Sequence, residues 1–152
     1  MWSLKRAKVL GIVTIMGLSG CGSSSTGPNP ASLVGTWQAT QAQLVAVSNA
    51  SITIDLVKDL GGTVELVLAA DKTFTLTITL PPEPADQSAG TWASTDILTL
   101  TYTSGQSGNQ QFDLNLNGDT LTLTGANTDY DFPNDAISGP VPAKVNLILQ
   151  RQ

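Results

Sequence analysis

The sequence predicts an all-β fold, a small up-and-down antiparallel barrel of about eight strands. Apolar residues alternate with polar residues, most often threonine, along successive runs of the chain, which is the pattern of half-buried strands. Residues typical of tight turns separate these runs, so neighbouring strands are expected to form hairpins. Only the segment 54–60 has a weak helical pattern. A β-sandwich is the alternative, because sequential short strands also build two packed sheets.

The clearest strand is the run 73–80, in which large apolar residues at even positions alternate with threonine at every odd position. The same alternation, together with a Gly-Thr-Trp triplet near the start of two runs, places the other strands. Strands are expected at residues 35–46, 62–70, 73–80, 89–95, 97–104, 110–117, 120–125 and 143–151. Tight turns are expected at 71–72 and 117–119, and the prolines within 81–84 require a longer connection.

The beginning of the chain is predicted to be an export signal. A basic start at residues 5–8 precedes the apolar segment 9–18, which is about half as long as a membrane-spanning helix. The segment ends in the motif Leu18-Ser19-Gly20-Cys21, which contains the only cysteine of the chain. This motif closely resembles the lipobox of bacterial lipoproteins.

The lipobox resemblance implies cleavage between Gly20 and Cys21, a diacylglyceryl thioether on Cys21 and a further acyl chain, such as palmitate, on the new amino terminus. Two or more acyl chains hold a protein stably at a membrane. Gly22 follows the cysteine, and the sorting rule of these lipoproteins then favours the outer membrane, with the protein facing the periplasm. The alternative is an ordinary signal peptide, residues 1–20, with an incidental cysteine.

The residues after the leader divide into a tether and a folded domain. Residues 22–31 are rich in glycine, serine and proline, so 21–31 is expected to be a lipidated cysteine and a flexible tether. The domain is expected to span 32–152. Loss of the leader removes three of the seven basic residues and none of the twelve acidic ones, which leaves a net charge of −8. An acidic surface gains nothing from anionic lipid, so the membrane partner is expected to be reached through the anchor alone.

Composition excludes several kinds of chemistry. One cysteine and no histidine exclude a disulfide within one chain, a Cys/His zinc site and every histidine-dependent nucleophile. A sequence pI near 4.3 argues against a nucleic-acid partner, because phosphate binding needs a basic face. The sequence also contains no Gly-x-Ser-x-Gly elbow and no phosphate-binding glycine loop. We expect no enzymatic activity and no cofactor.

Both ends of the domain resemble a known family. The domain opens with Leu33-Val34-Gly35-Thr36-Trp37, and the last strand ends with Leu149-Gln150-Arg151. These features resemble the lipocalin-like domains found on many bacterial lipoproteins, over roughly residues 32–152. The resemblance implies that Gly35 and Trp37 pack at a closed barrel end, with Arg151 over the tryptophan. The alternative is that Trp37 is an ordinary core residue and Arg151 a solvated one.

An acidic segment near the end of the chain is a weak candidate for a calcium site. Asn127, Asp129, Asp131 and Asp135 supply the oxygen ligands that a hard cation prefers. The EF-hand template fails, because Phe132 stands where it needs glycine. The favoured interpretation is a solvated acidic loop, so no metal site is predicted.

The apolar faces of the strands give the second candidate site. In a wide barrel they would surround a pocket for a small apolar ligand, whereas interdigitating side chains would form only a core. The candidate ligand-lining residues are Phe74, Leu76, Ile78, Leu100, Tyr102, Phe112, Leu114 and Leu147. The expected function is that of a monomeric, membrane-anchored binding module; the alternative is a structural or interaction protein of the cell envelope with a packed core and no ligand.

Overall fold

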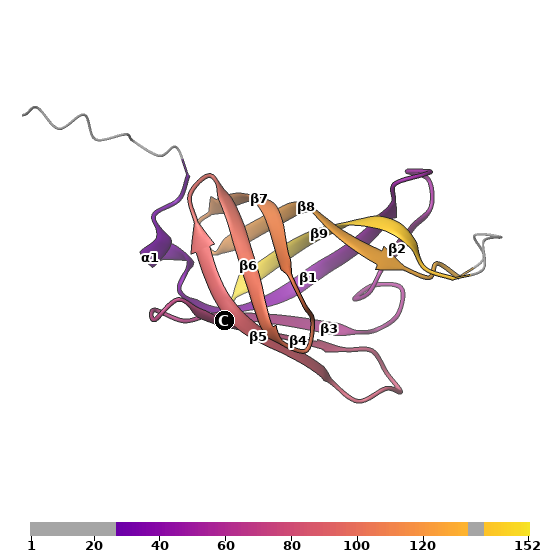
Figure 1. Ribbon diagram of the computed structural model, residues 1–152, viewed down its shortest axis with the longest axis horizontal. Coiled ribbons are helices and arrows are strands. Elements are labelled where there is room, and N and C mark those ends of the chain that lie inside the picture. Colours follow the sequence, from indigo (N-terminus) through magenta and orange to yellow (C-terminus); the bar gives the residue numbers. More distant parts are fainter. Residues whose placement is uncertain (1–26, 134–138) are drawn as a thin grey trace, which may run out of the picture.

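Antiparallel strands close into a barrel in the computed structural model, which describes residues 27–133 and 139–152 (Figure 1). Strands β1 and β3 to β9 follow one another around the ring, and β9 pairs with β1 to close it. The short strand β2 pairs with residues 43–45 of β1. The elements are α1 (Pro30–Leu33), β1 (Gly35–Ala46), β2 (Thr53–Asp55), β3 (Thr63–Leu68), β4 (Thr73–Thr79), β5 (Asp86–Ser94), β6 (Ile97–Ser104), β7 (Asn109–Asn117), β8 (Thr120–Tyr130) and β9 (Val141–Arg151). The predicted barrel is confirmed, and the sandwich alternative is wrong because the β1–β9 ladder closes the sheet on itself.

Two strands extend at least three residues further than their patterns predict. The fourth predicted strand, 89–95, is β5, which begins at Asp86 because residues 86–88 already pair with β4. The seventh, 120–125, is β8, which continues to Tyr130 because its second half pairs with β9. The predicted leader 1–20, Cys21 and the first part of the predicted tether lie outside the described residues.

The weak helical pattern over 54–60 does not produce a helix. Residues 53–55 form β2 against β1, and residues 56–60 form turns. Pairing with Leu44 buries Ile54, which is 7% exposed. A weak helical pattern shorter than two turns gains little on its own, so the tertiary pairing decides the conformation. The short helix α1, which has Pro30 at its start and Asn29 as its cap, was not predicted either.

A tryptophan on β1 and an arginine on β9 close one end of the barrel. Trp37 is fully buried, and its indole N–H donates a hydrogen bond to the Leu33 carbonyl at 2.8 Å. The Arg151 guanidinium lies over the indole, with Cζ 4.2 Å from the ring centroid. Its two terminal nitrogens donate to the carbonyls of Val34 and Ser32 at 2.8 and 2.6 Å. The structure therefore places Trp37 and Arg151 as the resemblance implies, and Arg151 is not a solvated residue.

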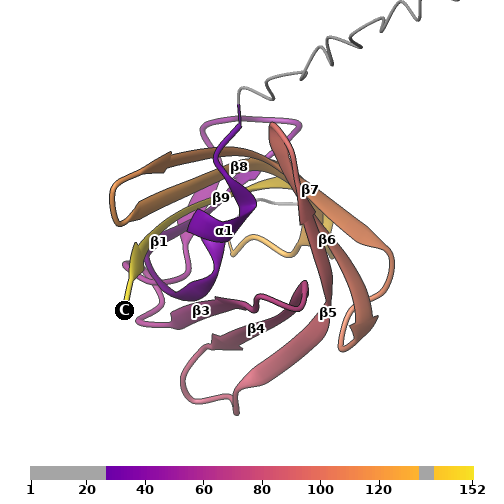
Figure 2. The ribbon, with the colours of Figure 1, turned by 90° about the vertical axis from the view of Figure 1, so that its left-hand side faces the viewer.

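The helix α1 lies across this closed end, as the view along the barrel shows (Figure 2). Gly35 follows α1 with φ of 148°, a conformation that residues with a Cβ rarely adopt. A Cβ there would also lie 2.6 Å from the Arg151 Nη1. Glycine at this position therefore lets the guanidinium approach the backbone while it covers the indole.

The second Gly-Thr-Trp triplet makes a related contact at the same end. The Lys72 ammonium lies 3.9 Å from the centroid of the Trp92 ring, and the Trp92 indole N–H donates to the Ala69 carbonyl at 3.0 Å. Gly90 does not start a strand as predicted but lies within β5, where the register with β6 shifts. A Cβ at Gly90 would overlap the Thr101 carbonyl oxygen, so this glycine is required by a close approach of two strands.

Large side chains fill the half of the barrel nearest α1. The rings of Phe74 and Tyr102 meet edge to face there, with centroids 5.2 Å apart. The largest fully buried side chains of the barrel are Trp37, Leu33, Leu66, Leu68, Leu98, Leu100, Leu121, Leu123, Leu149 and Val64. Of these, Val64 lies toward the opposite end, where it pairs with Ile78. Within residues 27–133 and 139–152, no helix has the length and apolar character needed to cross a bilayer.

The strand pairings, the buried core and the closing contacts of the described structure all lie between residues 27 and 152. A fragment of residues 22–152 therefore contains every contact that builds the barrel, and the experiments below use this fragment.

A buried carboxylate fixes the connection between β1 and β3. Asp55, which is 7% exposed, accepts hydrogen bonds from the backbone N–H groups of Ala42, Val57 and Lys58 at 3.0–3.2 Å. Burial alone raises the pKa of Asp55, but these three hydrogen bonds and the charge of Lys58 outweigh it and hold the pKa below its usual value of 3.8. Asp55 therefore joins β2 and its turn to β1 as an ionised group.

Replacement of Arg151 is expected to open the closed end. Arg151→Ala should lower the free energy of unfolding by about 2–4 kcal/mol, because it removes the cation–π contact and two charge-assisted hydrogen bonds. Arg151→Lys should recover less than half of this loss, because an ammonium cannot stack flat and donate to two carbonyls at once. Urea unfolding of the fragment measures both values. Asp119→Asn is the control and should cost about 1 kcal/mol or less, since Asp119 is 79% exposed in its ion pair with Arg151. Equal stability of Arg151→Ala and the unmodified fragment would contradict the assignment.

Asp55→Asn is expected to lower stability in a pH-dependent way. At neutral pH the loss should be about 1–2 kcal/mol, because the charge that strengthens three hydrogen bonds is removed. A carboxylate whose pKa is lowered on folding stabilises the protein above its unfolded-state pKa, and that contribution disappears as the pH falls through the folded-state pKa. The difference between the two proteins should therefore shrink below the ordinary value of 3.8. Urea unfolding between pH 7 and pH 2.5 measures this; a difference that stays constant over the range would rule the explanation out.

Candidate ligand-binding cavity

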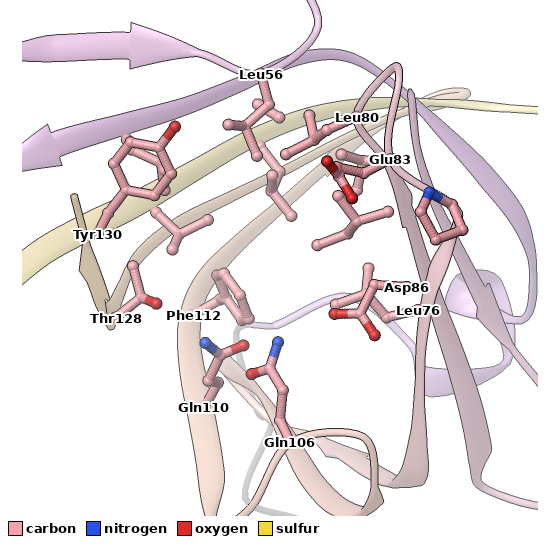
Figure 3. Close-up of a pocket in the computed structure, with 17 residues that line it drawn as sticks. Leu56, Leu76, Leu80, Glu83, Asp86, Gln106, Gln110, Phe112, Thr128 and Tyr130 are labelled. Atoms are coloured by element: carbon pink, nitrogen blue, oxygen red, sulfur yellow. The ribbon is translucent and has the colours of Figure 1, made fainter. Parts of the chain in front are cut away.

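A cavity of about 310 Å³ opens at the barrel end opposite α1. Its walls come from β1, β3, β4, β5, β7, β8 and β9 and from the β2–β3, β4–β5 and β6–β7 connections. Figure 3 shows the lining side chains around this space. The seventeen residues are Ala42, Leu44, Leu56, Val64, Leu76, Ile78, Leu80, Glu83, Pro84, Asp86, Gln106, Gln110, Phe112, Thr128, Tyr130, Val145 and Leu147. The size lies at the lower end of the range of about 300–1,000 Å³ that is typical of small-molecule sites.

The predicted lining residues divide between the cavity and the core. Leu76, Ile78, Phe112 and Leu147 line the cavity. The prediction is wrong for Phe74, Leu100, Tyr102 and Leu114, because their strand positions lie in the part of the barrel that large side chains fill. Both predicted kinds of interior therefore occur in the same barrel: one half has a packed core, and the other half has an open cavity.

A bulge in β8 supplies two lining residues that the sequence pattern missed. The ladder between β8 and β9 shifts register between Thr124 and Ala126, at Gly125, which has φ of 88°. Inward positions are odd-numbered before the bulge and even-numbered after it. Thr128 and Tyr130 consequently point into the barrel and line the cavity. A bulge at Thr40 has the same effect in β1, where the inward positions are odd-numbered before it and even-numbered after it.

The barrel wall is incomplete beside these residues. β7 pairs with β8 only from Asp113 to Asn117, so its first residues pair with β6 alone. The side chain of Gln110 bridges the gap: its amide nitrogen donates to the Asn127 carbonyl at 3.4 Å. Its amide oxygen accepts a hydrogen bond from the Tyr102 hydroxyl at 2.6 Å. Gln110 therefore links the packed core to the cavity wall.

Burial raises the pKa of both tyrosines of this region. The pKa of Tyr102 is raised to about 12. Burial and then the neighbouring Asp131 carboxylate raise the pKa of Tyr130. A phenol is already protonated at physiological pH, and these shifts extend its neutral range, so both side chains offer hydroxyl groups rather than charges.

Two carboxylates stand at the mouth of the cavity. Glu83 lies in the β4–β5 connection and Asp86 is the first residue of β5. Both side chains are exposed, and both belong to the lining, together with the amides of Gln106 and Gln110. Figure 3 shows Glu83 beside Leu80, Asp86 beside Leu76, and Gln106 beside Gln110. The sequence pattern alone does not place Glu83 here, because pairing of β4 with β5 is needed to bring it to the mouth.

The acidic segment does not converge on one point. Asn127 and Asp129 lie on the outer face of β8, and the Asn127 side-chain oxygen accepts a hydrogen bond from the Lys144 ammonium at 2.6 Å. Asp131 is exposed, and Asp135 lies outside the described residues. Across residues 27–133 and 139–152, no three acidic, histidine or cysteine side chains gather closely enough to hold a metal ion. Gly20 and Cys21 also lie outside the described part of the chain.

Comparison with known proteins agrees with this geometry. A protein-family model described as a lipocalin-like domain matches residues 33–123, which is more than half of the chain. No curated protein and no solved structure matches the chain. The matched segment includes Gly35 and Trp37 and the barrel strands from β1 to the first part of β8. The chain therefore belongs to the family of lipocalin-like domains.

Proposed function

We propose that this protein is a lipid-anchored binding protein that holds a small, mainly apolar molecule in the open end of its barrel. The observation that carries the proposal is the cavity of about 310 Å³, with twelve apolar or aromatic residues among the seventeen that line it. Binding of an apolar ligand in such a cavity is favourable, because the ligand removes the apolar lining from contact with water. Lipocalin-like domains are in general binding folds without enzymatic activity.

The anchor is part of the same proposal. The motif 18–21 supports lipidation at Cys21, and Gly22 supports the outer membrane and the periplasmic side. The described chain enters the barrel at the closed end, where α1 lies. The cavity opens at the other end, so an anchor on Cys21 leaves the mouth uncovered by the entering chain.

A matched pair of substitutions tests the binding site. Val145 lines the cavity, whereas Val47 is 59% exposed on the outside. In the fragment, Val145→Phe should fill part of the cavity and weaken binding of a neutral apolar dye, such as N-phenyl-1-naphthylamine, by about tenfold or more. Val47→Phe should leave dye binding within about twofold. Fluorescence titration measures both affinities, and circular dichroism checks that both variants keep the β fold.

Two outcomes would contradict the proposed site. One is a fragment that binds no dye although it is folded. The other is a folded Val145→Phe variant that binds the dye as tightly as the unmodified fragment, which would place the dye elsewhere on the surface. Native mass spectrometry of the secreted fragment adds an independent measurement, because a carrier is expected to retain a small molecule from its host.

A further inference from the structure

The cavity has an apolar interior, and the charged side chains at its mouth are all negative. Its lining contains two carboxylates, Glu83 and Asp86, and no lysine or arginine. Both carboxylates are exposed, so they remain next to water while the apolar residues behind them are largely buried. In a ligand that lies along this cavity, the inner part therefore contacts apolar side chains, and the outer end lies next to negative charge.

The backbone holds the two carboxylates in fixed places. Asp86 pairs with Ile78 at the start of the β4–β5 ladder. The backbone N–H of Glu83 donates to the Leu80 carbonyl at 2.8 Å, which closes a turn after β4. The rigid prolines around Glu83 at 81, 82 and 84 limit this loop further. The negative charge at the mouth is therefore a feature of the fold and not of a free terminus.

Neither carboxylate is neutralised by the protein. Among the described residues, no ion pair and no side-chain hydrogen bond involves Glu83 or Asp86. The cations of the described residues have other partners. Lys72 covers Trp92, Arg151 covers Trp37, and Lys144 binds Asn127. The fourth, Lys58, pairs with Asp55 and donates to Gln41. A metal ion is not the expected counter-charge, because no third acidic, histidine or cysteine group joins these two within residues 27–133 and 139–152.

We propose that the cavity selects a short single-chain amphiphile with a cationic head, such as an alkylammonium, rather than a fatty acid. The alkyl chain lies against Leu56, Leu76 and Phe112, and the ammonium lies at the mouth between Glu83 and Asp86. This inference rests on the proposed binding function and adds the charge of the ligand to it. An anionic head at the same place meets two like charges, which weakens its binding.

Size and hydrogen bonding agree with this ligand class. A volume of about 310 Å³ suits one short chain and excludes the two chains of a phospholipid. The lining amide of Gln106 offers an oxygen acceptor that an ammonium can use, since an ammonium has three donors and no acceptor. A carboxylate head has only acceptors and gains nothing from Glu83 or Asp86.

The test compares three ligands that share one chain. Decylammonium, decanol and decanoate, each below its critical micelle concentration, displace N-phenyl-1-naphthylamine from the fragment at neutral pH and low salt. Decylammonium should bind about tenfold more tightly than decanoate, with decanol between them, because each exposed carboxylate contributes a small favourable or unfavourable amount. Raising the salt concentration to about 1 M should reduce the ratio, since salt screens exposed charges.

Substitutions assign the selectivity to the two carboxylates. Glu83→Gln and Asp86→Asn should each lower the ratio of the decylammonium and decanoate affinities by about threefold, and the double variant should bring it close to one. Decanol binding should remain within about twofold in all three variants. Glu65→Gln is the matched control: Glu65 lies on the outer face of β3 and is absent from the cavity lining, but its loss changes the net charge equally. The ratio should be unchanged in this control.

The outcomes separate this inference from the binding function itself. Failure of the dye, decanol and decylammonium to bind overturns both. Binding of decanol with equal or tighter binding of decanoate than of decylammonium overturns the charge selectivity alone. A fall in the ratio with Glu65→Gln as large as that with Glu83→Gln also overturns it, because the effect then comes from net charge and not from the mouth.

Discussion

The pairing of the first barrel strand with the last is the contact on which the other features of the structure depend. The ladder between β1 and β9 runs from Trp37 opposite Arg151 to Ala46 opposite Ala143. It converts an open sheet with two exposed edges into a ring, which removes the unpaired backbone groups that an edge strand presents. The same register brings Arg151 over Trp37, so closure of the barrel and closure of its end result from one set of contacts.

Closure at one end leaves the other end free to hold a cavity. Near α1, the inward positions carry tryptophans and a set of leucines that exclude water. At the opposite end, β1 and β9 place smaller residues inward, among them Ala42 and Val145, and these do not reach across the barrel. The volumes of the inward side chains therefore decide which half of the barrel has a packed core and which half has a cavity.

The polar groups of the open half lie where the regular ladder is interrupted. The bulge at Gly125 turns Tyr130 inward, and the early separation of β7 from β8 leaves Gln110 to bridge the wall. The β4–β5 connection brings Glu83 to the mouth. A binding fold needs such irregular positions, because a perfect alternation of apolar and polar residues gives only a core and a solvated face. The chemistry of the site thus comes from loops and bulges carried on a rigid ring.

The sequence by itself determined the all-β class, the barrel and the approximate position of every barrel strand. These are local signals, since the alternation of threonine with Leu76 or Ile78 needs no knowledge of distant residues. Tertiary structure decided how far β8 extends, that residues 53–55 pair with β1, and which face Thr128 and Tyr130 occupy. It also decided that Phe74 and Leu100 belong to the core and Leu76 to the cavity. The physical reason is that a period of two shows which residues point inward, whereas bulges, strand register and the volumes of facing side chains set what they meet there.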